Sequence, residues 1–217
     1  MLSSLDPVAE VTPPSVLAEH GGTNSPWMLR RVAPDLYFVS YPDLSPQQSI
    51  SLEKTPLDVL AQDLRGFMDS AAALCGASTI VLDCHGGPDN TSLAACLVAD
   101  HSLLVSEPDR ITFYGTLHFL RRLDLAAEGR PYDVRLIFNK VVPAFSSGFL
   151  FRLYESELRP AFSGRPLAAL FPLEIYLTKE FEITPLVTRV YPGSLLARKT
   201  QLMLWNLLAE GDSSALH

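Results

Sequence analysis

The alternation of short apolar runs with amphipathic stretches is the feature that most constrains the fold of this chain. Runs typical of buried strands occupy residues 79–83, 102–106, 134–139 and 168–170. Stretches with helical spacing of apolar residues separate these runs and follow the last of them. Strand–helix–strand connections of this kind are right-handed and give parallel strands. The sequence therefore predicts an α/β fold with a doubly wound, mainly parallel sheet flanked by helices.

The remaining expected elements follow from turn and capping residues. Helices are expected at 56–74, 90–99, 111–127, 149–162 and 194–208, with Thr55 as the N-cap of the first. A short buried strand at 36–40 follows an irregular segment over 1–35 that is rich in proline and glycine. Because no linker or internal repeat divides the sequence, we expect one domain with its core at 36–208 and a tail at 209–217.

Composition and charge exclude several classes of protein. Apolar residues make up 47% of the 217 residues and the formal net charge is −7, which is typical of a globular protein. A generic nucleic-acid surface needs clustered Lys and Arg, and the negative net charge argues against one while leaving room for a local basic patch. The longest apolar run, at 167–177, is too short to span a bilayer and is interrupted by Pro172 and Glu174. We therefore expect a soluble, cytoplasmic protein without a membrane segment.

The three cysteines, Cys75, Cys84 and Cys96, form no zinc-binding pattern. All three lie in apolar stretches, so we expect buried, reduced thiols, which suits the cytoplasm.

The residues that follow the predicted strands carry the chemistry, because ligands of such sheets bind at the carboxyl ends of the strands. Asp83 ends the run at 79–83 and is placed to hold a Mg²⁺-bound water, and the glycines Gly86 and Gly87 allow close approach of a phosphate. The alternative is a tight turn with a helix-capping acid. Asn139 offers a donor and an acceptor that suit a purine edge, although a strand-ending Asn is also a common cap. Glu107-Pro108-Asp109 is interpreted as a turn before a helix.

Taken together, these segments resemble the ParA/MinD family of P-loop ATPases with a deviant Walker A motif. The resemblance rests on Ile80–Gly87, Leu93–Asp100, Leu103–Asp109, Leu136–Lys140 and Phe171-Pro172, and continues through Pro185–Val187 and Pro192–Ser194. It covers most of residues 36–208.

The resemblance implies ATP and Mg²⁺ as cofactors and a nucleotide-dependent dimer that acts as a switch in positioning, partition or regulation. Asp83 would be the acid near Mg²⁺, acting through water, and Gly86 and Gly87 would face the γ-phosphate. Asn139 would contact adenine, and Pro172, in the segment that resembles the family's closing segment, would be a further cofactor-binding residue. Cys84-His85 departs from the family pattern at the switch. His85 is either a general base or, on the simpler interpretation, a surface-loop histidine.

The family's phosphate loop, K-G-G-x-G-K-[ST], has no match in this sequence. Gly21-Gly22-Thr23 and Ser146-Ser147-Gly148 lack the lysine and the flanking elements. Since such a loop makes most of the phosphate affinity, we expect weak or absent ATP binding and no hydrolysis by this chain alone.

Two explanations stay open for the missing loop. In the first, the start site has been placed too far downstream or the gene is split. In the second, the protein is a true degenerate relative that is completed by a partner. The alternative function is a non-catalytic interaction module that pairs with a P-loop-bearing partner. An unrelated α/β enzyme using Asp83, Cys84 or His85 is a third possibility.

Overall fold

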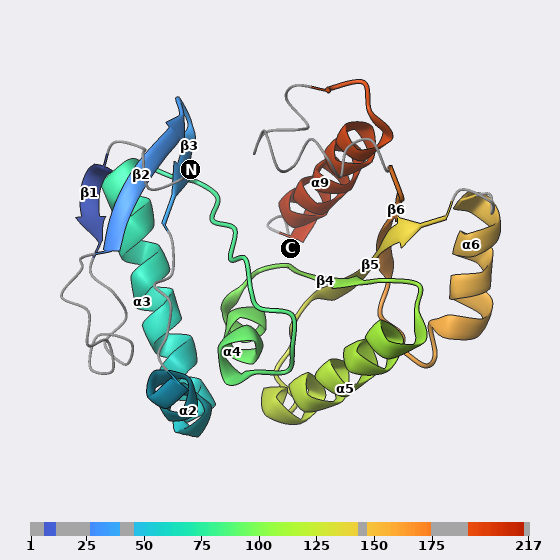
Figure 1. Ribbon diagram of the computed structural model, residues 1–217, viewed down its shortest axis with the longest axis horizontal. Coiled ribbons are helices and arrows are strands. Elements are labelled where there is room, and N and C mark those ends of the chain that lie inside the picture. The colour runs from blue at the N-terminus through green and yellow to red at the C-terminus, as the bar shows by residue number, and fades with distance from the viewer. Residues whose placement is uncertain (1–6, 12–26, 40–45, 143–146, 175–190, 215–217) are drawn as a thin grey trace. The chain divides into compact units, whose positions relative to one another are not determined.

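The computed structural model describes residues 7–11, 27–39, 46–142, 147–174 and 191–214. The chain divides into two compact units, Met1–Ala99 and Asp100–His217 (Figure 1). Each unit has its own sheet and its own cluster of buried apolar side chains. The single domain expected from the sequence stays a prediction.

The first unit contains a small antiparallel sheet of order β1-β2-β3. Its strands are β1 (Pro7–Val11), β2 (Trp27–Ala33) and β3 (Leu36–Phe38). The prediction that residues 1–35 are irregular is therefore wrong for two segments. The proline content suggested irregular chain, but Pro7 is compatible with a strand. It occupies the first position of β1, where the N–H that proline lacks is least needed.

The turn from β2 to β3 is held by a side chain. The Arg31 guanidinium donates hydrogen bonds to the Pro34 carbonyl, at 2.6 Å from Nη2, and lies over the Tyr37 ring. β3 is shorter than the strand expected at 36–40, and Leu36 and Phe38 are exposed. The expectation of a buried strand here is wrong because β3 is the edge of a small sheet.

The helices of the first unit are α2 (Pro46–Lys54), α3 (Leu57–Cys75) and α4 (Asn90–Val98). α3 and α4 confirm the predicted helices, whereas α2 was not expected. Thr55 does not cap α3, because its hydroxyl donates to the Ser51 carbonyl at 3.0 Å and so closes the end of α2. Pro56 occupies the N-cap of α3, and Gly76 ends the helix in the left-handed conformation, at φ 69°.

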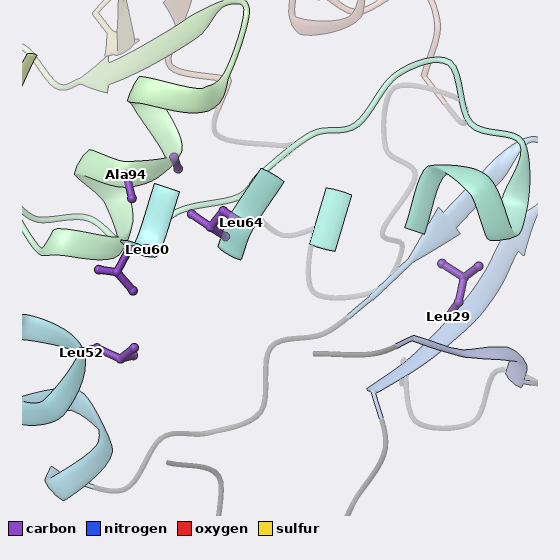
Figure 2. Close-up of a cluster of buried hydrophobic side chains, with 6 residues drawn as sticks. Leu29, Leu52, Leu60, Leu64 and Ala94 are labelled. Carbon is purple, nitrogen blue, oxygen red and sulfur yellow. The ribbon is translucent and has the colours of Figure 1, made fainter. Parts of the chain in front are cut away.

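Figure 2 shows the buried core of the first unit. Leu60 and Leu64 lie one turn apart on α3 and are buried with Leu29 of β2 and Leu52 of α2. Ala94 and Ala95 of α4 complete the cluster. Full burial of a leucine side chain stabilises a fold by about 1.5–3 kcal/mol, so each of these four leucines contributes an amount of this order to the first unit.

The strand predicted at 79–83 is absent. Ile80 and Val81 are exposed, Val81 to 86%, and within the described residues the segment pairs with no strand. A parallel strand is stable only when neighbouring strands take its backbone hydrogen bonds and other elements cover its faces. β-branched residues alone do not supply either, so the prediction is wrong for this structure.

The second unit contains a parallel sheet of order β4-β5-β6. Its strands are β4 (Ser102–Ser106), β5 (Val134–Val141) and β6 (Leu167–Pro172). All three were expected, and their parallel pairing with helices on both sides confirms the predicted α/β class. β5 runs two residues further than the expected strand at 134–139.

The helices of the second unit are α5 (Arg110–Ala127), α6 (Ser147–Leu153) and α9 (Leu195–Ser214), with a π-helical turn η2 at Tyr154–Leu158. α5 confirms its prediction. One continuous helix was expected at 149–162. The structure has the short α-helix α6, which ends at Leu153 and is followed directly by the π-helical turn η2. α9 continues beyond residue 208 into the segment that was expected to be a tail.

Two apolar clusters cover the two faces of this sheet. On one face Ile137 of β5 and Phe171 of β6 pack with Met203 and Leu207 of α9. On the other face Phe138, the next residue along β5, contacts the rings of Tyr154 and Phe162. Adjacent residues of a strand point to opposite faces, so α9 and the η2 region lie on opposite sides of the sheet.

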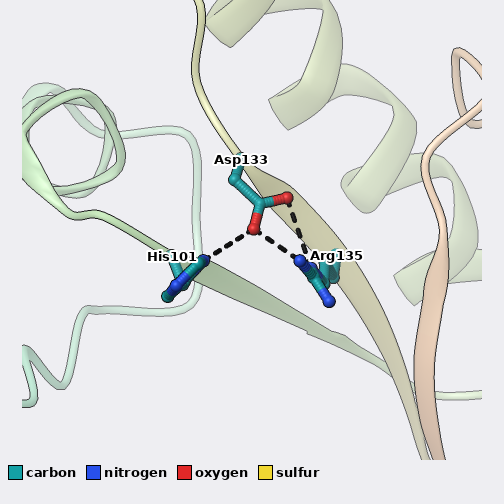
Figure 3. A network of polar contacts seen from close by, with 3 residues as sticks. All are labelled: His101, Asp133 and Arg135. Atoms are coloured by element: carbon teal, nitrogen blue, oxygen red, sulfur yellow. Dashed lines mark hydrogen bonds and ion pairs between the residues drawn. The ribbon is translucent and has the colours of Figure 1, made fainter. Parts of the chain in front are cut away.

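Polar contacts hold the parallel sheet of the second unit at the start of β4 and β5 and at the end of β6. Where β4 and β5 begin, Asp133 accepts from His101 Nδ1 at 2.7 Å and from Arg135 Nε at 3.0 Å (Figure 3). At the start of α9, the Glu174 carboxylate accepts from the Leu196 N–H at 2.8 Å and thereby joins the end of β6 to this helix.

No helix within the described ranges combines the length and apolar character needed to cross a membrane.

Candidate functional site

The predicted phosphate-side residues lie in the loop of the first unit that joins α3 to α4. Asp83, His85 and Gly86 are exposed. The acid that caps α4 is Asp89, which accepts from the Ser92 N–H at 2.9 Å and from the Ser92 hydroxyl at 2.6 Å. The interpretation of this segment as a turn with a helix-capping acid is therefore correct for Asp89, and His85 is a loop histidine.

Gly86 and Gly87 have open space where a side chain would project. A Cβ atom built on either residue meets no other atom within 4 Å, and neither glycine has a positive φ. Nothing in the loop itself therefore requires glycine at these positions. Among the side chains that the structure describes, no three His, Cys, Asp or Glu residues gather into a metal-binding group. The roles assigned to Asp83, Gly86 and Gly87 stay predictions.

Cys84 differs from the buried thiol that was expected. The residue is exposed, whereas Cys75 and Cys96 are partly buried. Neighbouring protein atoms nevertheless desolvate its thiolate, and the charges of Cys96, Asp89 and Asp83 add to this effect. Together they raise the pKa of the Cys84 thiol to about 11. Cys84 is accordingly a poor nucleophile at neutral pH, which counts against an enzyme that uses this thiol.

The predicted base-side residues lie in the second unit, at the carboxyl end of its parallel sheet. Asn139 belongs to β5 and Pro172 is the last residue of the neighbouring strand β6, where it is the register partner of Val141. The Leu173 N–H donates to the Val141 carbonyl at 3.0 Å and continues this pairing. The structure thus brings Asn139 and Pro172 to the same edge, while Asp83, Gly86 and Gly87 share the loop of the first unit.

A β-bulge shapes this edge at Asn139 and Lys140. Phe138 pairs with Leu170 and Val141 pairs with Pro172, so β5 carries one residue more than β6 between these pairs. Lys140 adopts the left-handed conformation, at φ 55°, which is uncommon for a residue with a side chain. Asn139 therefore lies inside the strand and next to its irregularity, not at the strand end as expected. Bulges of this kind redirect side chains and are frequent beside functional sites.

An ion pair joins the ends of β4 and β5 across the same edge. Lys140 Nζ lies 2.6 Å from Glu107 Oε1, and both side chains are substantially exposed. This contact was not expected from the sequence. Its signal was the presence of opposite charges directly after two predicted neighbouring strands.

Asp109 begins α5 at this edge. Its carboxylate accepts from the hydroxyl of Thr112 at 2.6 Å and from the N–H groups of Ile111 and Thr112. These bonds, with the Thr112 hydroxyl contributing most and the charge of Lys140 least, hold the pKa of Asp109 below its usual value. The interpretation of 107–109 as a turn before a helix is confirmed.

The last segments of the family resemblance are only partly described. Pro192–Ser194 forms the turn before α9, where the Ser194 hydroxyl accepts from the Ala197 N–H at 3.1 Å. Pro185–Val187 lies outside the described residues.

Comparison with known proteins identifies a fold. No protein-family model matches the sequence, and no curated protein matches it either. Among solved structures, the chain is similar to a ParA family ATPase from Chlorobium tepidum TLS, with a TM-score of 0.57 and 19% sequence identity. The match covers 83% of this chain and 66% of that chain. The chain therefore has a ParA-like α/β fold and spans less than two thirds of the length of the protein it matches.

Proposed function

We propose that this chain is a truncated or degenerate ParA/MinD-like protein that acts as a nucleotide-dependent switch in partition, positioning or regulation. The observation that supports the proposal most is the ParA-like fold, which extends over 83% of the chain. The order of the strand-end residues supports it as well. The chain would work in the cytoplasm, either as a homodimer or with a partner that supplies the phosphate-loop unit.

The proposed nucleotide contacts are those that the family resemblance implies. Asn139, beside the bulge of β5, would read the adenine edge, with Pro172 next to the base. Asp83 would hold Mg²⁺ through a water molecule, and Gly86 and Gly87 would face the γ-phosphate. The open space at both glycines fits close approach of a phosphate, since no atom of the described residues fills it.

The isolated chain is expected to bind ATP weakly and not to hydrolyse it. A phosphate loop contributes backbone N–H groups, a lysine and a Mg²⁺-binding hydroxyl, and these make most of the affinity for the triphosphate. The sequence contains no loop of this form. Asp83 and Asn139 by themselves would leave most of the phosphate charge without donors.

A binding measurement tests this proposal. We expect a fluorescent ATP analogue with Mg²⁺ to bind the chain tightly only when a polypeptide carrying a strand, a K-G-G-x-G-K-[ST] loop and a helix is added. Asp83→Asn should weaken the restored binding, whereas Asp69→Asn, a matched change at an exposed position of α3, should not. If the added polypeptide leaves the affinity unchanged, the proposal is wrong.

The second candidate function is a non-catalytic interaction module of the same fold. The exposed segment 79–83 favours it, because this apolar run pairs with no strand among the described residues. The genomic sequence before the start codon separates the two candidates. An in-frame phosphate-loop motif supports a truncated ATPase, and an early stop codon supports a genuine module.

A further inference from the structure

Two consecutive residues of β5, Asn139 and Lys140, lie outside the register of the parallel sheet. The register with β4 ends at the pair of Ser106 and Phe138, and the register with β6 passes from Phe138 directly to Val141. Among the described strands, neither Asn139 nor Lys140 therefore has a register partner. The direction of their side chains depends on the local backbone of the bulge more than on the ladder of the sheet.

A side chain beyond the end of β4 contacts this bulge. Glu107 directly follows β4, and its Oε1 lies 2.6 Å from Lys140 Nζ. The Lys140 backbone has a φ of 55°, a conformation that steric repulsion disfavours for lysine and that glycine and asparagine adopt more readily. An unfavourable backbone conformation persists only where its surroundings hold it, and the ion pair with Glu107 is a contact that can do so.

We propose that Glu107 is a positioning residue for Asn139. By holding the Lys140 ammonium, Glu107 keeps the Lys140 backbone left-handed, and this fixes the direction in which the preceding residue, Asn139, presents its side-chain amide. The inference deepens the proposed function and rests on it in one respect, which is that this amide reads the adenine edge.

The size of the effect follows from the exposure of the pair. The Lys140 and Glu107 side chains are 55% and 37% exposed, so water screens their attraction. An exposed pair of this kind changes an equilibrium by roughly two- to fivefold. Because lysine disfavours the left-handed backbone, loss of the pair makes this backbone a minor state. The affinity for the base then falls in proportion to the population of that state.

The test titrates the full chain with adenosine and follows the side-chain amide of Asn139 by NMR. Adenosine has no phosphate and therefore probes the base contact without a phosphate loop. It is also uncharged, so screening by salt acts on its binding through charges of the protein alone. We expect Glu107→Gln and Lys140→Met each to weaken binding by roughly two- to fivefold, and about 0.5 M NaCl to weaken binding by the wild type to a similar extent.

Lys140→Asn is the decisive variant, because asparagine carries no charge but tolerates the left-handed backbone. It should bind adenosine like the wild type, and adding Glu107→Gln to it should change nothing. Glu155→Gln is the matched control, since it removes the carboxylate of another partly exposed ion pair, with Arg159, and should leave binding unchanged. If a Lys140 variant does not fold, Glu107→Gln and the salt dependence decide.

The proposal is overturned if Glu107→Gln binds adenosine like the wild type, or if Lys140→Asn loses as much affinity as Lys140→Met. If adenosine does not shift the Asn139 amide of the wild type, the base contact of the proposed function is refuted. Nitrogen relaxation of this amide in the ligand-free chain then decides the role of Glu107. Lower order in Glu107→Gln than in the wild type supports the positioning of Asn139, and equal order overturns it.

Discussion

Replacing Phe162 with alanine tests whether the second unit is built around one aromatic cluster. Phe162 is fully buried. Its ring lies 4.9 Å from that of Phe113 on α5, and 6.0 Å from those of Phe138 on β5 and Tyr154 in η2. One side chain thus contacts three separate elements of the unit.

The expected loss follows from this environment. Removal of a buried phenylalanine ring costs about 3–5 kcal/mol. Three ring contacts place this residue in the upper half of that range, because each favourable aromatic pair adds about 0.5–1.5 kcal/mol beyond burial. We therefore expect Phe162→Ala to destabilise the second unit by about 4 kcal/mol, which is a large fraction of the 5–15 kcal/mol typical of a domain.

Hydrogen exchange at the β5 amides measures this loss within the unit itself. A loss of about 4 kcal/mol speeds exchange through global opening by roughly a thousandfold. Phe151→Ala on α6 is the control, since that ring is 46% exposed and its removal should cost less than about 1 kcal/mol. A loss below about 1 kcal/mol for Phe162→Ala would refute the packing described here.

Three further predictions concern the loops and the start of α9. Lys140→Gly should be at least about 1 kcal/mol more stable than Lys140→Ala in urea unfolding, because only glycine is unstrained at φ 55°; equal stabilities would contradict the bulge. Cys84 should react with iodoacetamide at pH 8 about tenfold more slowly than an unperturbed thiol. Its pKa of about 11 lowers the thiolate fraction roughly a hundredfold, which the greater nucleophilicity of the thiolate offsets only in part. The rate should rise through pH 10, and Asp89→Asn should increase it at pH 8; a plateau near pH 9 would argue against the raised pKa. Glu174→Ala should destabilise α9 by about 0.5–1 kcal/mol, because the first N–H groups of this helix lose their acceptor. Faster hydrogen exchange in α9 measures the loss, and Glu157→Ala, at an exposed position, is the control that should leave this exchange unchanged.

The elements that the sequence predicted well are those whose stabilising contacts are near in sequence or face one core. α5 is an example, because Asp109 caps it and its buried residues Thr116, Leu120, Leu123 and Ala127 recur at helical spacing. β5 is another, since both of its faces are covered by packed side chains. In such segments the pattern of apolar residues and the final environment agree.

The incorrect predictions concern segments whose state depends on distant partners. The run at 79–83 has the composition of a strand, but a strand forms only beside a neighbour. β1 and β2 show the opposite error. Their proline-rich segment was predicted to be irregular, but it forms strands because the two pair with each other in antiparallel fashion. Pairing of this kind is non-local and leaves little trace in local composition.

The candidate site was predictable in its residue types and not in its geometry. Asn139 and Glu107 stood out because they follow apolar runs. The bulge depends on the left-handed backbone of Lys140, a conformation that sequence does not suggest for lysine. The alignment of Glu107 with Lys140 depends on the register between β4 and β5.

Phosphate release from the purified chain with Mg²⁺ and ATP is the most direct test of the proposed function. We expect no release above the rate without protein, and release only after a phosphate-loop polypeptide is added. Asp83→Asn should then abolish the restored activity while Asp69→Asn preserves it. Clear turnover by the chain alone would contradict the proposal.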